Sequence, residues 1–131
     1  MTDQLSAYLA QERLRPFEWG QRNGDCCLFA FGWTAEAWGI DPRPAHWGKY
    51  STEDQVIAYV KTLGGLPAIL KSHYGSPVND DPRRGDIALL DTPQGLLGAI
   101  CSGGAFWFRC NRTGVGFIPL RHGKPTHIWR R

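Results

Sequence analysis

The sequence contains no apolar run near the ~20 residues that a helix needs to cross a bilayer, so no membrane span is expected. Its first residues, MTDQLSAYLAQERLRP, lack the basic stretch and apolar core that mark a secretory signal peptide. These two absences predict a protein that is made in the cytoplasm and stays soluble, unless a larger assembly carries it out.

A strong charge of one sign is also missing, since 15 basic and 12 acidic residues give a net charge of only +3. A general affinity for nucleic acid is therefore not expected. The charge is nevertheless divided along the chain. Residues 1–65 carry 6 basic and 8 acidic side chains, for −2, whereas residues 66–131 carry 9 and 4, for +5. The second half thus predicts either a solvated basic face or a contact with an acidic partner or polyanion.

Cysteine is sparse, and its spacing does not match a metal site. The chain has one adjacent pair and no C-x-x-C motif; its four cysteines are Cys26, Cys27, Cys101 and Cys110. Without a signal peptide, these residues are expected to be free thiols rather than a disulfide framework. We therefore predict no metal and no cofactor. The alternatives are a metal or iron–sulfur site built from all four cysteines, or a disulfide formed after release from the cell.

Repeats, low-complexity segments and long linkers are absent, so residues 1–131 are expected to form a single domain. Apolar periodicity and end signals predict helices over residues 3–15, 26–38, 51–63 and 66–74. The pattern then changes to short β-branched or aromatic runs: GDIALLD, GLLGAICSG, AFWFRC, GVGFIPL and a terminal THIWR. This order predicts an α+β domain whose N-terminal helices, led by the one at 26–38, pack on a C-terminal antiparallel sheet.

Two further patterns carry packing expectations. In the third helix, Ser51 and Asp54 resemble a capping box, and the stripe expected to be buried consists of Val56, Ile57, Val60 and Leu63. Six tryptophans in 131 residues favour an aromatic-rich core or a sizeable contact surface. Of the aromatic residues, we expect Phe17, Trp33 and Trp38 in the core, Trp47 and Trp129 at the surface, and a binding surface around Trp19, Trp47 and Trp107.

The segment GDCCLF holds the main candidate for chemistry. Asp25 is a good N-cap for the second helix, which places Cys26 at the first helical position. Unpaired N–H groups and the helix dipole favour a thiolate there, so Cys26 is a candidate nucleophile. Cys27 points about 100° away on a helix and is expected to be a packing residue. The alternative is that both cysteines only fill space.

An aspartate–cysteine pair that opens an apolar helix, followed by PRRGDIALL and a glycine-bearing second strand, is similar to the NlpC-type cell-wall peptidases. These are papain-like cysteine hydrolases that cut the stem peptides of peptidoglycan. The resemblance spans roughly residues 15–110. It implies a papain-like fold over the domain, with Cys26 at the position of the nucleophile.

A second resemblance covers nearly the whole chain. The segments PFEWGQRNGDCCLF, GGL, RGDIALLD, LGAICSG and the terminal IW resemble a family of small, uncharacterised phage and prophage proteins. These are encoded among tail genes and are thought to be relatives of the NlpC group. This resemblance implies a location in the tail of the virion, with other tail-tip proteins as partners.

The histidine base of the NlpC group does not carry over. Those enzymes have it at the start of the second strand, in a pattern such as H-V-G-I, where this chain reads LLGAI. The position falls on Leu96 or Leu97, neither of which accepts a proton, and AFWFRC offers no obvious third polar residue. Of the four histidines, at 46, 73, 122 and 127, His127 is the weak candidate for a substitute base.

Three functions follow from these patterns. The first is a structural or assembly protein of the phage tail tip or baseplate with a degenerate papain-like fold. Its Trp-rich loops and basic C-terminal half would be the docking surface. The second is an active cysteine peptidase or amidase that opens peptidoglycan while DNA enters the cell. The third is a module that binds a cell-wall fragment or small ligand without chemistry. The missing histidine and the tail-gene resemblance favour the first.

Overall fold

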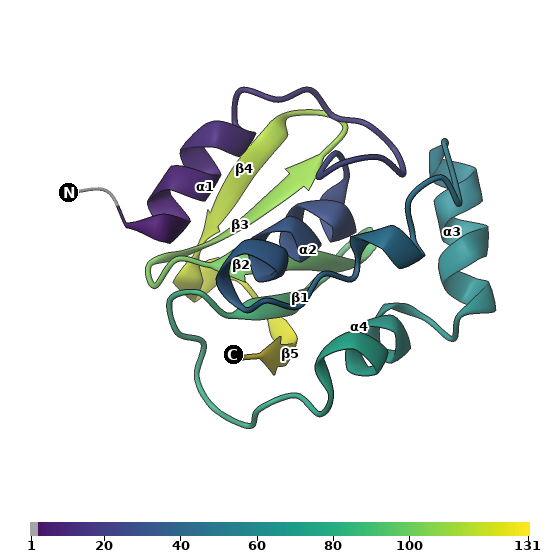
Figure 1. Cartoon of the computed structure of the whole chain (residues 1–131). Helices are drawn as coiled ribbons and strands as arrows, with labels where there is room; N and C mark the ends of the chain where they lie inside the picture. The colour runs from purple at the N-terminus through teal and green to yellow at the C-terminus, as the bar shows by residue number, and fades with distance from the viewer. Residues whose placement is uncertain (1–2) are drawn as a thin grey trace.

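The computed structural model describes residues 3–131, in which four α-helices precede a five-stranded antiparallel sheet (Figure 1). The helices are α1 (Gln4–Glu12), α2 (Cys26–Ala37), α3 (Glu53–Thr62) and α4 (Leu66–Tyr74), with short 3-10 turns η1 (Arg43–Ala45) and η2 (Leu120–His122). The strands are β1 (Ile87–Thr92), β2 (Gly95–Cys101), β3 (Ala105–Cys110), β4 (Gly114–Pro119) and β5 (Pro125–Trp129). The predicted α+β class is confirmed.

The strands lie in the order β4-β3-β2-β1-β5, so the first four form a meander and the last returns beside β1. β1 pairs with β2 from Ile87↔Ile100 to Thr92↔Gly95, and β3 pairs with β4 over the full length of both strands. The ladder between β2 and β3 covers only Ile100↔Trp107 and Cys101↔Phe106. The two strands therefore part towards the start of β2 and the end of β3.

Helix α2 is the central helix and packs on β2 and β3 (Figure 1). Its residues from Leu28 to Thr34 are all buried, because the sheet covers one face while α1 and η1 contact the other. A helix that is covered on all sides has apolar residues all round, as the sequence of α2, CCLFAFGWTAEA, does. Gly32 is required where α2 meets Tyr8 and Asn23, since a Cβ atom there would collide with both side chains.

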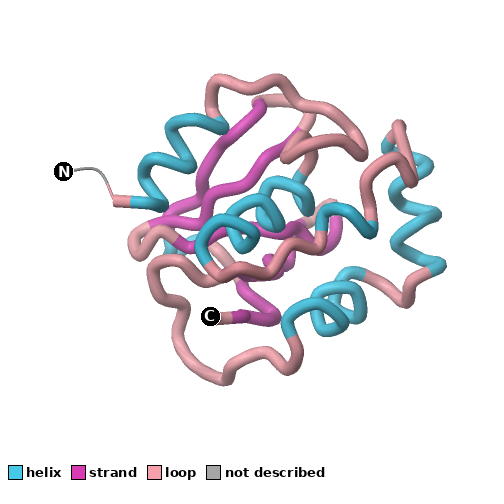
Figure 2. The backbone as a smooth tube through the Cα atoms, in the orientation of Figure 1, coloured by secondary structure: helices cyan, strands magenta, loops and turns pink. Residues whose placement is uncertain are grey.

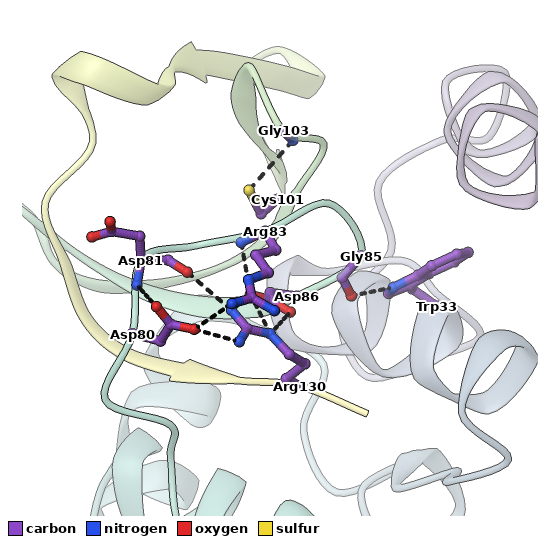
Figure 3. A network of polar contacts seen from close by, with 9 residues as sticks. All are labelled: Trp33, Asp80, Asp81, Arg83, Gly85, Asp86, Cys101, Gly103 and Arg130. Atoms are coloured by element: carbon purple, nitrogen blue, oxygen red, sulfur yellow. Dashed lines mark hydrogen bonds and ion pairs between the residues drawn. The ribbon is translucent and has the colours of Figure 1, made fainter.

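The chain after β5 is fixed by a network of charged groups (Figure 3). Asp86 is 2% exposed and accepts hydrogen bonds from the Nε and Nη2 atoms of Arg130, at 3.0 and 2.8 Å. Nη1 of Arg130 donates to Asp80 at 2.9 Å, and Nη2 also donates to the carbonyl of Asp81. A buried carboxylate is stable here because the guanidinium neutralises it with well-formed bonds.

A second buried ion pair joins the sheet to α1. Arg109 on β3 and Glu12 on α1 are each 1% exposed, and the guanidinium also donates to the carbonyl oxygens of Glu12 and Pro16. The guanidinium lies 5.5 Å from the ring centroid of Phe29 on α2. Its Nε is the one buried side-chain N or O atom in residues 3–131 without a hydrogen-bond partner.

The stripe prediction for α3 is wrong. No residue of this helix is buried, and Ile57 and Leu63 are 60% and 43% exposed. Val56 and Val60 are half-buried, and Val60 packs against the main core cluster. The reason is position: α3 lies at the edge of the molecule, away from the sheet, where nothing covers its outer face (Figure 2). Its cap is Thr52, which accepts from the N–H of Gln55, rather than Ser51.

Among the tryptophans, the expectation for Trp129 is also wrong. It is 1% exposed because β5 lies beside β1, and its indole N–H donates to the carbonyl of Gly75. Trp33 is buried and Trp47 is 38% exposed, both as expected, while Trp38 and Phe17 are half-buried. No helix in residues 3–131 has the length and apolarity that crossing a bilayer requires.

Candidate functional site: a cleft at the start of α2

A cleft of about 810 Å³ opens where β2 and β3 part, and Cys26 at the first position of α2 lines it. We call it the Cys26 cleft. Its walls come from the loop before α2, the two parted strands and the segments that flank them. Its lining includes Phe17, Trp19, Leu96, Leu97, Phe108, Arg109 and Cys110. The site is therefore a consequence of the short β2–β3 ladder.

The start of α2 is held by Asp25, which is 1% exposed. One carboxylate oxygen accepts the N–H of Leu28 at 3.0 Å, and the other accepts the N–H of Gly20 at 2.9 Å and the hydroxyl of Tyr50 at 2.7 Å. The predicted cap is confirmed. Burial raises the pKa of Asp25, and these hydrogen bonds act against that rise. The carboxylate is thus fully engaged in fixing the backbone around Cys26.

The two neighbouring cysteines differ in their surroundings. Cys26 lines the cleft, whereas Cys27 packs against the main core cluster, the arrangement expected from their positions on the helix. A hydrogen bond with the Cys26 side chain, together with burial, raises the pKa of Cys27 well above its ordinary value. Cys27 is a protonated packing residue at neutral pH, and of these two neighbours it is Cys26 that a ligand in the cleft can reach.

The strand that faces Cys26 is apolar. A Cβ atom built on Gly98 would lie 3.6 Å from the carbonyl oxygen of Cys26, so β2 passes close to the first turn of α2 at this point. The preceding residues, Leu96 and Leu97, line the same cleft. On β3, Arg109 and Cys110 line the cleft. The guanidinium of Arg109 is committed to α1 and the following loop, and the thiol of Cys110 lies 3.1 Å from the hydroxyl of Thr113. No side chain of β2 at residues 96–98 can accept a proton.

The structure places the histidines differently from the sequence-based prediction. His127 lies on β5, paired with Leu89 of β1, and stacks on Trp129 with ring centroids 5.6 Å apart. It does not line the Cys26 cleft. The histidine that does is His122, an exposed residue of η2. Nothing in the sequence singled out His122, because η2 contains no recognisable motif. This turn lies at the cleft only because the fold places the connection between β4 and β5 there.

Tyr50 is a second residue of this region that the sequence did not reveal. It is 6% exposed and lies in a loop 25 residues from its partner Asp25. Its neighbours Gly48 and Lys49 give no periodic signal. Only the folded chain shows that its hydroxyl completes the hydrogen-bonding of the cap.

The charges around the cleft are mixed. Arg112, His122 and Lys124 line it from the β3–β4 turn and the segment before β5, whereas Glu53 and Asp91 line it from α3 and from β1. The basic residues all belong to the C-terminal half, so part of its positive charge faces the cleft. An amphipathic ligand with aromatic and charged contacts fits this lining.

The three tryptophans predicted as a binding surface do not lie together. Trp19 lines the cleft and makes an edge-on contact with Phe17 at 4.7 Å. Trp47 lies under the guanidinium of Arg43, at 5.1 Å, and Trp107 packs against Phe117 at 4.9 Å. Only Trp19 belongs to the Cys26 cleft. Among residues 3–131, no three side chains of the metal-binding types converge on one point, and all four cysteines are free.

These features define a class of protein: an α+β domain in which a capped helix presents a cysteine to a cleft in a parted antiparallel sheet. The chain belongs to the family described as a domain of unknown function (DUF6950), whose match covers residues 1–131. No curated protein and no solved structure matched the chain.

Proposed function

We propose that this protein is a structural or assembly component of a phage tail tip or baseplate, built on a degenerate papain-like fold. The observation that carries the proposal is the apolar strand opposite Cys26. On the resemblance to the NlpC-type peptidases, the position of the histidine falls on Leu96 or Leu97, and both of these residues line the Cys26 cleft. In this proposal the strand gives the thiol no base, which the general-base step of nucleophilic catalysis requires.

The remaining geometry supports a scaffold rather than an enzyme. Asp25 holds its place through backbone and tyrosine donors instead of orienting an imidazole. Trp47 and Phe117 are 38% and 57% exposed on separate parts of the surface, which suits docking against several neighbouring proteins. In this proposal the partners are other tail-tip proteins, and the protein resides in the virion.

The test uses the phage or prophage that carries the gene. A nonsense mutation in the gene is expected to yield particles without functional tails, and wild-type protein supplied in trans is expected to restore infectivity. Cys26→Ala is expected to restore it equally, since the thiol performs no chemistry. Infectious tails assembled in the absence of the protein would refute the structural role.

A second function, an active cysteine peptidase or amidase that cleaves peptidoglycan, is favoured by one observation. His122 lines the same cleft as Cys26 and supplies an imidazole from outside the two strands. Purified protein is incubated with peptidoglycan beside Cys26→Ala and His122→Gln, with His127→Gln as the matched control. Turnover that is lost in the first two variants and kept in the control would establish the enzyme. The structural proposal expects no turnover by any of the four proteins.

A further inference from the structure

A small cavity of about 110 Å³ lies beside the loop between α1 and α2, and arginines from three parts of the chain line it. Arg15 follows α1, Arg22 belongs to the loop, and Arg109 comes from β3. We call this space the arginine cavity. Its volume is the share of roughly four waters in the liquid, so it holds a small ion but not a peptide or a nucleotide.

The arginine cavity is separate from the Cys26 cleft, although Arg109 lines both. Residues before α2 alternate between the two spaces: Pro16 and Glu18 line the cavity, whereas Phe17 and Trp19 line the cleft. The segment 16–19 therefore forms a wall between them. A ligand of this size can occupy the cavity while the cleft is empty.

Arg109 brings buried donors to the cavity that the protein leaves unused. A guanidinium carries five N–H groups. Within residues 3–131, Nη1 donates to the carbonyl of Pro16, and Nη2 donates to the carbonyl and the carboxylate of Glu12. Nε has no partner there, although Arg109 is only 1% exposed. Burial lowers the pKa of this guanidinium, and the carboxylate of Glu12 acts against that shift. Such a group is stabilised by a further acceptor, and most of all by a negatively charged one.

Asn23 supplies a second buried donor. It is 9% exposed and lines the cavity, and its Oδ1 accepts a hydrogen bond from Nη1 of Arg43 at 2.8 Å. Because an arginine can only donate, this bond identifies the oxygen of the amide and fixes its orientation. The Nδ2 group, with its two N–H donors, finds no acceptor among residues 3–131. It is therefore free to bind a ligand in the cavity.

The other two arginines also have donors to spare. Nε of Arg15 lies 3.2 Å from the carboxylate of Glu12, which leaves its two Nη atoms for a ligand. The contact of Arg22 with Glu18, at 3.9 Å, is longer than a hydrogen bond. Among the described residues, Glu18 is the one carboxylate that lines the cavity beside three arginines. The lining therefore carries an excess of positive charge.

The loop that carries Arg22 is held in a closed form. The N–H of Glu18 donates to the carbonyl of Gly24 at 2.8 Å, and the N–H of Gly24 donates to Gln21 at 2.9 Å. A Cβ atom on Gly24 would lie 2.4 Å from the carbonyl oxygen of Glu18, so this closure requires glycine. Arg22 itself has a left-handed backbone, with φ at 54°, and its carbonyl accepts the indole N–H of Trp47. The cavity is thus pre-organised by its own backbone.

We propose that the arginine cavity is a binding site for a small tetrahedral oxyanion, such as phosphate or sulfate. The unused donors of Arg109 and Asn23 bind its oxygens, and Arg15 and Arg22 neutralise its charge. Because these donors come from a strand, a loop and the end of a helix, they suit an ion with oxygens on all sides. The bound ion joins the connection between α1 and α2 to β3. This site lies outside the Cys26 cleft and goes beyond the function proposed above.

The test is isothermal titration calorimetry of the wild-type protein with inorganic phosphate, at constant ionic strength and in a buffer without other oxyanions. Saturable binding of one phosphate per chain is expected, and sulfate is expected to compete for the site. Acetate at the same concentration is expected to compete poorly, because a carboxylate presents its oxygens on one side only.

Two variants are expected to weaken the binding. Asn23→Asp keeps an acceptor for Arg43 but replaces the Nδ2 donor by a negatively charged oxygen, so the affinity for phosphate is expected to fall by about tenfold or more. Arg22→Asn removes a cation, and asparagine tolerates the left-handed backbone at this position. Its affinity is expected to fall by about threefold or more.

Glu18→Gln is expected to act in the opposite direction. It removes the carboxylate that repels an anion in the cavity, so phosphate is expected to bind about two- to fivefold more tightly. Arg121→Asn is the matched control, because Arg121 is an exposed arginine of η2 that does not line the cavity. Its affinity is expected to stay within about twofold of the wild type, since a distant exposed charge is screened.

Absence of saturable phosphate binding by the wild type would overturn the proposal. Equal affinities in the wild type, Asn23→Asp and Arg22→Asn would also overturn it, since the ion would then respond only to the net charge of +3. Acetate that competes as well as sulfate would overturn the assignment to a tetrahedral ion. If Asn23→Asp folds poorly, the opposite effects of Arg22→Asn and Glu18→Gln keep the test decisive, because both change partly exposed side chains.

Discussion

Helices α2 and α3 have similar lengths and both have apolar residues at helical spacing, yet they occupy opposite environments. Seven consecutive residues of α2 are buried, whereas α3 has none. The difference lies in what each helix meets: α2 rests on the sheet, and α3 lies at the edge and is linked to η1 through Tyr59. Periodicity therefore predicts a helix and its apolar face, but whether that face is covered depends on tertiary neighbours.

The largest expected effect comes from the ion pair beneath α2. Arg109→Met removes the buried cation beside Glu12, which keeps only the half-exposed Arg15 at 3.2 Å, and it leaves the carbonyl oxygens of Glu12 and Pro16 without their donor. The free energy of unfolding is expected to fall by about 3–5 kcal/mol. Denaturant titration measures this loss. The matched control is Arg84→Met, which breaks the half-exposed pair with Asp3 and is expected to cost about 1 kcal/mol or less. Equal losses in the two variants would mean that the buried pair has no special role.

The comparison between the helices is tested directly by shortening one apolar side chain in each. Leu28→Ala on α2 removes a fully buried side chain and is expected to cost about 2–5 kcal/mol, because it leaves a cavity. Ile57→Ala on α3 is expected to change stability by about 0.5 kcal/mol or less, since Ile57 is 60% exposed. A cost above about 1.5 kcal/mol for Ile57→Ala would show that α3 is covered in solution, for example in an oligomer.

The two N-caps extend the same contrast. Asp25→Ala removes an acceptor of three buried hydrogen bonds and is expected to cost about 2–3 kcal/mol. Thr52→Ala removes one exposed bond and is expected to cost about 0.5–1 kcal/mol. Chemical denaturation of both variants beside the wild type gives the comparison. A smaller cost for Asp25→Ala than for Thr52→Ala would contradict the role assigned to the buried cap.

The smallest effect is a difference within the unmutated protein. At pH 7.5, amides in the second half of α3 are expected to exchange at least about tenfold faster than those of α2, since α3 contributes no buried residue to the core. Hydrogen exchange resolved by peptide checks this order. Equal protection of the two helices would show that α3 opens only with the whole domain.

The sequence predicted much of the fold because local signals were strong. Asp25 before an apolar run marked the start of α2, and short runs between glycine and proline residues marked all five strands. The burial of Trp129 was not predictable, because it depends on β5 returning to the far side of β1. Cys26 was predictable as the candidate thiol because Asp25, which marks the start of α2, also places Cys26 at the first position of the helix.

Other parts of the site were not predictable from sequence. His122 reaches the cleft from η2, and Tyr50 meets Asp25 across 25 residues of chain. The contact between His46 and His73 similarly joins positions 27 residues apart. Such contacts depend on the path that the loops take over the surface of the folded core. Neither residue spacing nor composition within a short segment predicts that path.

The network of charged groups around Arg130 has a practical consequence for work with this protein. A tag or label joined at Arg131 lies next to Arg130, whose guanidinium neutralises the buried carboxylate of Asp86 through two hydrogen bonds. A flexible spacer of several residues keeps the added group away from these bonds, and shortening the chain to Trp129 would leave that carboxylate without its cation. The C-terminal end of the domain is therefore better suited to a tethered label than to truncation.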